Sequence, residues 1–241
     1  MAPARLSLAV LVVLASSRAS GGVLIEGTSG DRGAKGPERF LAEGQNVRVE
    51  TKDGESALIF DGAGKRMIQV DQASRSYTEI TQADMEKVRA LMSQRDAAPG
   101  KKPFSRRYEK IARTDSVLGK PCEVYRAVDA EGKSHDELCV APFGSFGVER
   151  SDFEGFRALG AFANAMAGHE GEQNWADLPG VPLIAWRTEG GARKETFRAT
   201  KVEKRSIPAT EFSVPAGWTR KPGPVEQLEQ LELKMMQKGT R

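Results

Sequence analysis

The chain has 241 residues, of which 36 are basic and 33 acidic, giving a formal net charge of +3. A balance this close to neutral excludes a strong overall electrostatic attraction to nucleic acid. The hydrophobic fraction of 39% is ordinary for a globular chain and supplies enough apolar material for one sizeable core.

The first residues have the order of a secretory leader. Arg5 precedes an apolar run over residues 6–15, and small residues follow up to Gly21. The run is too short to span a bilayer, and no later stretch is apolar enough to be a transmembrane helix. We therefore expect residues 1–21 to be a signal peptide, cleaved after one of residues 19–21. The mature chain would then be periplasmic or secreted; the alternative is a buried N-terminal strand.

Residues 22–81 consist of short alternating segments separated by Gly, Asn and Asp. In the third segment Val47 and Val49 point to one face and Arg48 to the other, as a half-buried strand requires. Turn signals about ten residues apart predict an antiparallel meander. The expected strands are VLIEGTS, ERFLAEG, NVRVETK, SALIFDG, RMIQVD and SYTEIT.

Two helices are expected after this meander. Thr81 is followed three residues later by Asp84, the spacing of a capping box. Ser151 and Glu154 repeat that spacing before SDFEGFRALGAFANAMAG, whose apolar face is broad and aromatic. Further strands are expected in FSRRYEKIAR, in the hairpin that holds both cysteines, and in DLPGVPLIAWRTEGG, KETFRATKVEKR and EFSVPAGW.

The two cysteines, Cys122 and Cys139, flank the turn signal DAEG. A hairpin centred on Ala130 and Glu131 places them directly opposite each other, which suits a disulfide; a bulge in the turn would shift the register by one. Export favours oxidation. A nucleophile pair of Cys139 with His135 is disfavoured, because residues four apart on a strand lie about 13 Å apart. A metal site lacks ligands.

Other catalytic patterns fail on inspection. Ser145 lacks the preceding glycine of a nucleophile elbow, and residues 62–65 lack the first glycine of a phosphate loop. His169 has no second histidine after it and fits a polar loop. The basic run KKPFSRRYEKIAR fits a solvated strand face better than a contact with anionic lipid. We therefore expect no enzyme activity, no cofactor and no metal, with a hydrolase as the third choice.

Several short segments occur in a characteristic order: DQASRSYTEI, GKPCEVYRAV, DELCVAP, GVPLIAW and FSVPAGW. In this order they resemble the domain of unknown function 4412 family of exported bacterial proteins, over about residues 23–218. The layout of that family is similar to that of the outer-membrane lipoprotein carriers and receptors. The resemblance implies an α+β fold with a curved, half-open antiparallel β-barrel and helices that cover an apolar cavity for acyl chains. It implies no catalytic residues.

We predict three parts: a signal peptide over residues 1–21, an antiparallel β domain with two helices over 22–218, and a linker with an amphipathic helix over 219–241. The interior of such a domain is either packed or open to a ligand. The side chains predicted to line a cavity are Phe153, Phe156, Leu159, Phe162 and Met166. The favoured function is a non-enzymatic binding or carrier protein for a lipid, a lipoprotein or another apolar ligand.

The C-terminal helix carries an apolar stripe at helical spacing, formed by Val225, Leu228, Leu231 and Met235. A helix of this length is marginal alone in water. We therefore expect it to dock, and favour a protein partner over its own domain. The alternative function is a structural or interaction module of the cell envelope that uses this helix.

Overall fold

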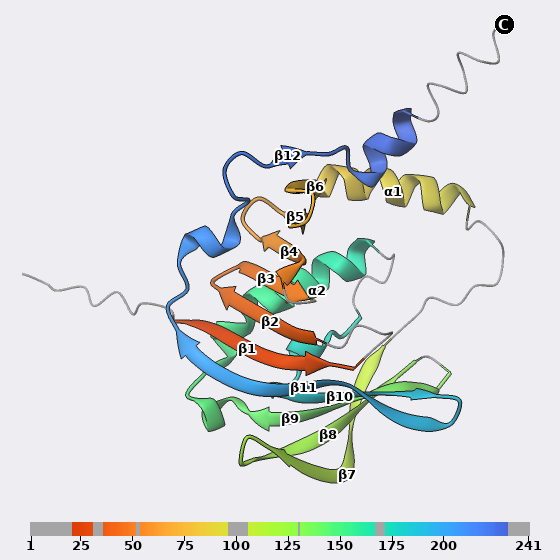
Figure 1. Cartoon of the computed structure of the whole chain (residues 1–241). Coiled ribbons are helices and arrows are strands. Elements are labelled where there is room, and N and C mark those ends of the chain that lie inside the picture. The colour runs from red at the N-terminus through yellow and green to blue at the C-terminus, as the bar shows by residue number, and fades with distance from the viewer. Residues whose placement is uncertain are drawn as a thin grey trace, which may run out of the picture.

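The structure is a computed structural model, and it describes residues 21–30, 36–51, 54–95, 106–129, 131–166 and 172–230. Within these residues twelve strands form one open sheet (Figure 1), in the order β12-β6-β5-β4-β3-β2-β1-β11-β10-β9-β8-β7. All neighbouring pairs are antiparallel except β12 with β6. The α+β class and the large antiparallel sheet predicted from the sequence are confirmed.

The first six strands form the predicted meander, in which each strand pairs with the next one in the chain. Alternation produces it: Val47 is fully buried and lies opposite Ala42 on one neighbouring strand and Phe60 on the other. The strands are β1 (Gly22–Ser29), β2 (Gly36–Glu43), β3 (Asn46–Thr51), β4 (Ser56–Asp61), β5 (Arg66–Asp71) and β6 (Ser76–Thr81).

A second meander runs in the other direction from β1. Its strands are β7 (Arg107–Val117), β8 (Lys120–Val128), β9 (Ser134–Pro142), β10 (Gly180–Glu189) and β11 (Ala192–Arg205). The two meanders join where β1 pairs with β11. Figure 1 shows that the β7–β8 hairpin is strongly twisted relative to the strands of the first meander.

Helix α1 (Gln82–Arg95) begins where the sequence predicted. The capping box is present: the backbone N–H of Asp84 donates to Thr81 Oγ1 at 3.2 Å, and the N–H of Thr81 donates to the Asp84 carboxylate at 2.9 Å. The two bonds satisfy backbone donors at the helix start that have no partner within the helix. None of the helices in the described part of the chain has the length and apolar character needed to cross a membrane.

Helix α2 (Glu154–Met166) is preceded by the 3-10 turn η3 (Arg150–Phe153). The predicted capping pair of Ser151 and Glu154 is wrong. The reciprocal bonds are made by Glu149 and Asp152, because the chain begins to coil one turn earlier, as η3. Asp152 is buried and is also paired with Lys204 Nζ at 2.9 Å, which ties the start of α2 to β11.

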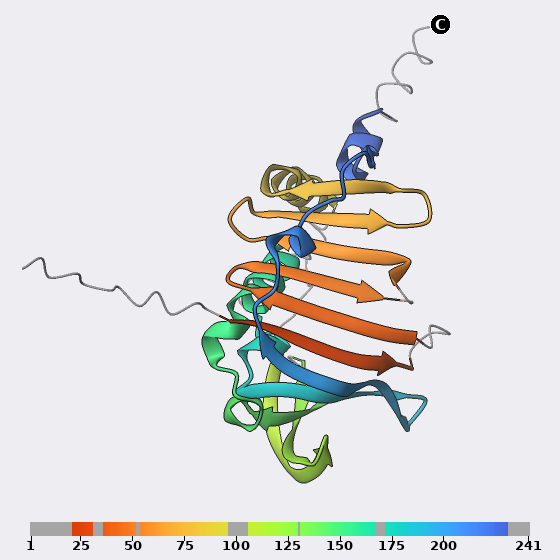
Figure 2. The same ribbon diagram turned by 60° about the vertical axis from the view of Figure 1, so that its left-hand side comes forward.

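The main core lies between α2 and the inner face of the sheet. Figure 2 shows the strands one above another with both α-helices on the same side. Phe153 and Phe156 are enclosed, with exposed fractions of 0% and 2%. They form a run of touching rings with Phe143 and Trp175, with centroid separations of 5.0, 5.6 and 5.1 Å along the run. The space between the start of α2 and the sheet is therefore filled by these aromatic rings.

The outer face is covered by the chain after β11. The predicted strand EFSVPAGW is wrong: it forms the 3-10 turn η5 (Ala209–Phe212) and an irregular strap. Gly217 takes a φ of +81°, which a strand does not allow. Phe212, Val214 and Trp218 pack on buried side chains of β4 and β5 such as Ile59. The aromatic and β-branched residues that suggested a strand serve instead to cover the sheet.

The chain continues into the sheet beyond Trp218, where the sequence placed the domain boundary. β12 (Thr219–Arg220) pairs in parallel with β6. A helix begins at residue 224 and is described to residue 230. Its first turn is docked on the domain, because Val225 is only 4% exposed and the Glu229 carboxylate lies 2.7 Å from Lys87 Nζ of α1.

The predicted apolar stripe of this helix is divided between two environments. Val225 is buried against its own domain, whereas Leu228 is 47% exposed. Leu231 and Met235 lie outside the described residues, as do residues 1–20, which hold most of the predicted signal peptide.

Candidate functional site

A pocket of about 180 Å³ lies on the inner face of the sheet, where β1, β2 and β11 meet β9, β10 and the 3-10 turn η4 (Trp175–Asp177). Its lining is apolar except for one carboxyl group. The lining residues are Ile25, Glu38, Phe40, Leu138, Trp175, Pro182, Ala185 and Phe197. We call this site the inner pocket.

Strand alternation places the polar and the aromatic side chains of the inner pocket. Glu38 and Phe40 are two residues apart on β2, so they point to the same face. Phe40 meets Phe197 of β11 edge to face, with centroids 5.4 Å apart and planes at 85°. Gly27 of β1 makes room for this pair, because a Cβ there would lie 2.3 Å from the Phe197 ring. A glycine and two aromatic residues thus shape this wall.

Glu38 is the one ionisable side chain in the lining. Burial raises the pKa of its carboxyl above the ordinary value, and a hydrogen bond with the Ser29 side chain offsets part of the rise. Burial disfavours the charged form of a carboxylate. Glu38 is therefore suited to form a hydrogen bond with a polar group of a ligand whose remaining part is apolar.

A second cavity, of about 200 Å³, lies between α1, the end of α2 and the C-terminal segment. Its carboxylates already hold structural partners. Asp84 caps α1, Glu79 is paired with Arg66 and Arg220, and Glu226 accepts from the backbone N–H of Gly223 at 2.7 Å. We therefore regard it as a gap between packed elements and the inner pocket as the candidate site.

The side chains predicted to line a cavity lie elsewhere. Phe153 and Phe156 are part of the packed core, and Leu159 and Phe162 pack against it. Met166 lines the second cavity. The lining of the inner pocket includes none of the five, because it comes from strands and from η4 rather than from α2.

One signal for the inner pocket was present in the sequence. Glu38 lies in phase with Phe40 and Ala42 on β2, where Ala42 is fully buried. A carboxylate on the buried face of a strand is uncommon unless it is paired or functional. Trp175 and Phe197 gave no such signal, because their approach depends on the folding of segments far apart in the sequence.

Over residues 23–218 the sequence matches the family described as Domain of unknown function (DUF4412). The chain belongs to the DUF4412 family. No curated protein matches this DUF4412 chain. One similar solved structure is that of an uncharacterized conserved protein from Thermus thermophilus, with a TM-score of 0.48 and 9% identity over 84% of this chain and 91% of that one. PNGF-II has a TM-score of 0.42 and 10% identity over 87% of this chain and 32% of its own.

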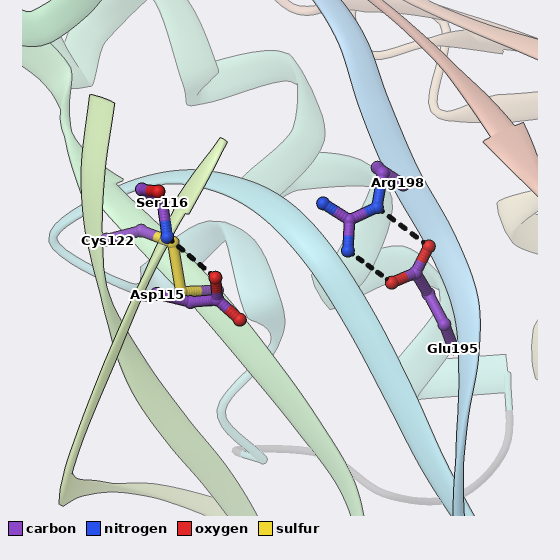
Figure 3. Close-up of a disulfide and its surroundings, with 6 residues drawn as sticks. Asp115, Ser116, Cys122, Glu195 and Arg198 are labelled. Atoms are coloured by element: carbon purple, nitrogen blue, oxygen red, sulfur yellow. Dashed lines mark hydrogen bonds and ion pairs between the residues drawn. A yellow bond between two sulfur atoms is a disulfide. The ribbon is translucent and has the colours of Figure 1, made fainter. Parts of the chain in front are cut away.

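The disulfide predicted for this DUF4412 chain is present. Cys122 and Cys139 are joined, with Cα atoms 5.4 Å apart, and both are buried. Figure 3 shows Asp115 and Ser116 of β7 beside Cys122, and the ion pair of Arg198 with Glu195 nearby. Asp115 lies opposite Cys122 in the pairing of β7 with β8, and it acts electrostatically on Arg198 of β11.

The register predicted around the disulfide is wrong. Val124, not Cys122, lies opposite Cys139, so the bridge joins diagonal neighbours. The turn causes the difference: Asp129 donates its backbone N–H to the Lys133 carbonyl, which makes the loop longer than the predicted turn, and a bulge follows beside Ala127.

Only some of the candidate catalytic and metal-binding residues of this DUF4412 chain lie in the part that the structure describes. His169 and the side chain of His135 lie outside the described residues. Over the part of the chain that the structure describes, no three His, Cys, Asp or Glu side chains come close enough together to hold a metal ion. Cys139 is consumed by the disulfide and is no free nucleophile.

Proposed function

We propose that this DUF4412 chain is an exported, non-enzymatic binding or carrier protein of the bacterial cell envelope that takes an acyl chain of a lipid or lipoprotein, or another apolar ligand, in the inner pocket. The observation that carries the proposal is a pocket with seven apolar lining residues around one carboxyl group. Ligand pockets are mostly apolar with a few placed polar groups. The volume of about 180 Å³ is below the ordinary range of about 300–1,000 Å³, so the pocket takes one segment of a longer chain.

Glu38 narrows the class of ligand. A carboxyl whose pKa is raised by burial binds best to a hydroxyl, an amide N–H or an amine, each of which can hydrogen-bond it. An acyl chain attached to an amide head offers such a group, the amide N–H, beside apolar carbons. A second anionic group would be repelled when Glu38 is charged, so a neutral or cationic head is favoured.

Two further features support the proposal. The open antiparallel sheet with α2 across its inner face supports the proposal, because such a sheet can enclose an apolar ligand. The disulfide is typical of an oxidising compartment, which agrees with export through a signal peptide.

The test is binding of a fluorescent long-chain acyl amide, whose head is neutral, with native mass spectrometry of the full chain purified from its own compartment. Ala185→Trp fills the inner pocket, and Ala192→Trp is the matched control, because Ala192 is exposed at the start of β11. We expect saturable binding, weakened at least about tenfold by Ala185→Trp and unchanged by the control. Equal affinity in both variants, or no saturable binding with no co-purifying acyl species, overturns the proposal.

A second candidate function is a structural or interaction module that uses the C-terminal helix. The exposure of Leu228, at 47%, favours it, because part of the apolar stripe faces solvent. Leu228→Glu would then abolish capture of a protein partner in crosslinking from the cell envelope and leave the acyl-amide titration unchanged.

A further inference from the structure

Glu137 of β9 is a buried carboxylate held by three arginines. Its side chain is 11% exposed. Arg113 Nη2 donates a hydrogen bond to Oε2, Arg193 Nε lies 2.9 Å from the same oxygen, and Arg126 Nη2 lies 3.4 Å from Oε1. The arginines come from β7, β11 and β8, so the curl of the second meander brings them to one point.

Trp186 of β10 forms the base of this cluster. It is 6% exposed and lies directly opposite Glu137, while Arg126 lies opposite Glu137 on the other side. The guanidinium of Arg193 lies 3.5 Å from the centroid of the indole ring, and that of Arg113 lies 5.7 Å from it. Stacking on an aromatic face holds a guanidinium in a fixed plane. The donors are therefore oriented in advance.

The cluster has an excess of positive charge. Three guanidiniums surround one carboxylate, which leaves a local net charge of +2, and Asp115 acts on Arg193 more weakly. Burial and then repulsion from Arg113 lower the pKa of Arg193, so a further anion would relieve the repulsion. Three other carboxylates of these strands are paired elsewhere, as Arg107–Glu109, Arg187–Asp136 and Arg198–Glu195.

The three arginines also have donors to spare. Their side chains are 38%, 44% and 35% exposed for Arg113, Arg126 and Arg193, and each guanidinium offers five N–H donors. The buried Nε–H of Arg113 has no acceptor among the residues that the structure describes. We propose that Arg113, Arg126 and Arg193, with Trp186 and Glu137 as their support, form a binding site for a phosphate-type oxyanion.

The chemistry of recognition is shared by two sources of that anion. A free phosphate or phosphate ester and the phosphate of a lipid headgroup present the same oxygens to a guanidinium fork. The site is separate from the inner pocket, because Glu137 and the pocket residue Leu138 are consecutive on β9 and point to opposite faces. The proposal therefore stands or falls independently of acyl-chain binding.

The test is calorimetric titration of the folded full chain with inorganic phosphate at constant ionic strength, with chloride as the reference anion. Arg126→Gln removes the most exposed member of the cluster, and Arg107→Gln, which carries the same charge change on β7 outside the cluster, is the matched control. Glu137→Gln raises the charge of the cluster by one. Circular dichroism verifies that each variant is folded.

We expect phosphate to bind saturably to the wild type. Its affinity should fall at least about fivefold in Arg126→Gln, rise at least about fivefold in Glu137→Gln and stay unchanged in Arg107→Gln. A fivefold change corresponds to about 1 kcal/mol of binding free energy. Vesicles of phosphatidylcholine with or without phosphatidic acid then distinguish the sources: cluster-dependent binding to the acidic vesicles identifies a headgroup, and its absence identifies a soluble phosphate. No saturable phosphate binding, or equal losses in Arg126→Gln and Arg107→Gln, shows a purely structural ion cluster and overturns the proposal.

Discussion

The disulfide between Cys122 and Cys139 limits the conformations open to the unfolded chain, so its removal should lower the stability of the fold. Its removal by Cys122→Ala with Cys139→Ala leaves two small apolar side chains at positions that are 1% and 0% exposed. The cysteines are 17 positions apart, so the bridge closes a loop of about 18 residues. In the chain-entropy account, opening a loop of that length costs about 3 kcal/mol of folding free energy.

The measurement is the thermal midpoint of the oxidised protein and of the double variant, followed by circular dichroism. For a domain of about 200 residues, 1 kcal/mol moves the midpoint by about 2–4 °C, so we expect a fall of about 6–12 °C. The double variant should not respond to reductant, which is the control. A fall of less than about 3 °C would refute the reasoning, because the bridge would then contribute little beyond the surrounding hairpin.

Thiol chemistry gives an independent check on the same bridge. Both cysteine side chains are buried, with exposed fractions of 1% for Cys122 and 0% for Cys139. Thiol–disulfide exchange requires access to a sulfur atom, so the native protein should resist mild reductant and show no reactive thiol. Two thiols that react readily in the native, oxidised preparation would contradict the assignment.

Two further predictions follow from named contacts. Burial raises the folded-state pKa of Glu38, so the wild type should lose stability as pH rises above about 4.5 toward that folded pKa. Glu38→Gln should remove this loss, so its thermal midpoint should be higher than that of the wild type at pH 7, with a smaller difference at pH 4. A lower midpoint of the variant at pH 7 would contradict the raised pKa. Val225→Ala should lower the free energy of unfolding by about 1–2 kcal/mol, because the side chain is 4% exposed. Leu228→Ala on the same helix should change it by no more than about 0.5 kcal/mol, because that side chain is 47% exposed. Equal effects of the two variants in denaturant unfolding would show that the helix is not docked.

Local patterns predicted much of the fold. The alternation of apolar residues in segments such as NVRVETK is a property of a strand and its nearest neighbours, so the first meander follows directly from it. The capping box of Thr81 and Asp84 is equally local, since it depends on only four consecutive residues. The cysteine pairing was also accessible, because the hairpin brings the two strands together even though the turn shifts their register.

The errors arise where a distant segment decides the outcome. EFSVPAGW has the composition of a strand, but its place on the outer face is set by buried residues such as Ile59, which lies more than 150 positions earlier. The start of α2 depends on Asp152 reaching Lys204. The inner pocket combines Ile25, Trp175 and Phe197, and no pattern within one segment could bring them together. A broad apolar face on α2 predicted burial, but it could not distinguish packing against rings from packing against a cavity.

The pairing of β1 with β11, which joins the two meanders, affects the order in which the chain can fold. β1 to β6 pair with strands that are adjacent in the chain, and so do β7 to β11 except across α2, so each meander can form from contacts of short sequence separation. In this pairing Gly22 of β1 lies opposite Arg205 of β11. Bringing such distant residues together costs loop-closure entropy before any contacts are gained. The two halves therefore assemble late, once nearly the whole chain is available. A chain with this topology stays unjoined at its centre until the residues near Arg205 have been synthesised, so each meander can form before the sheet is completed.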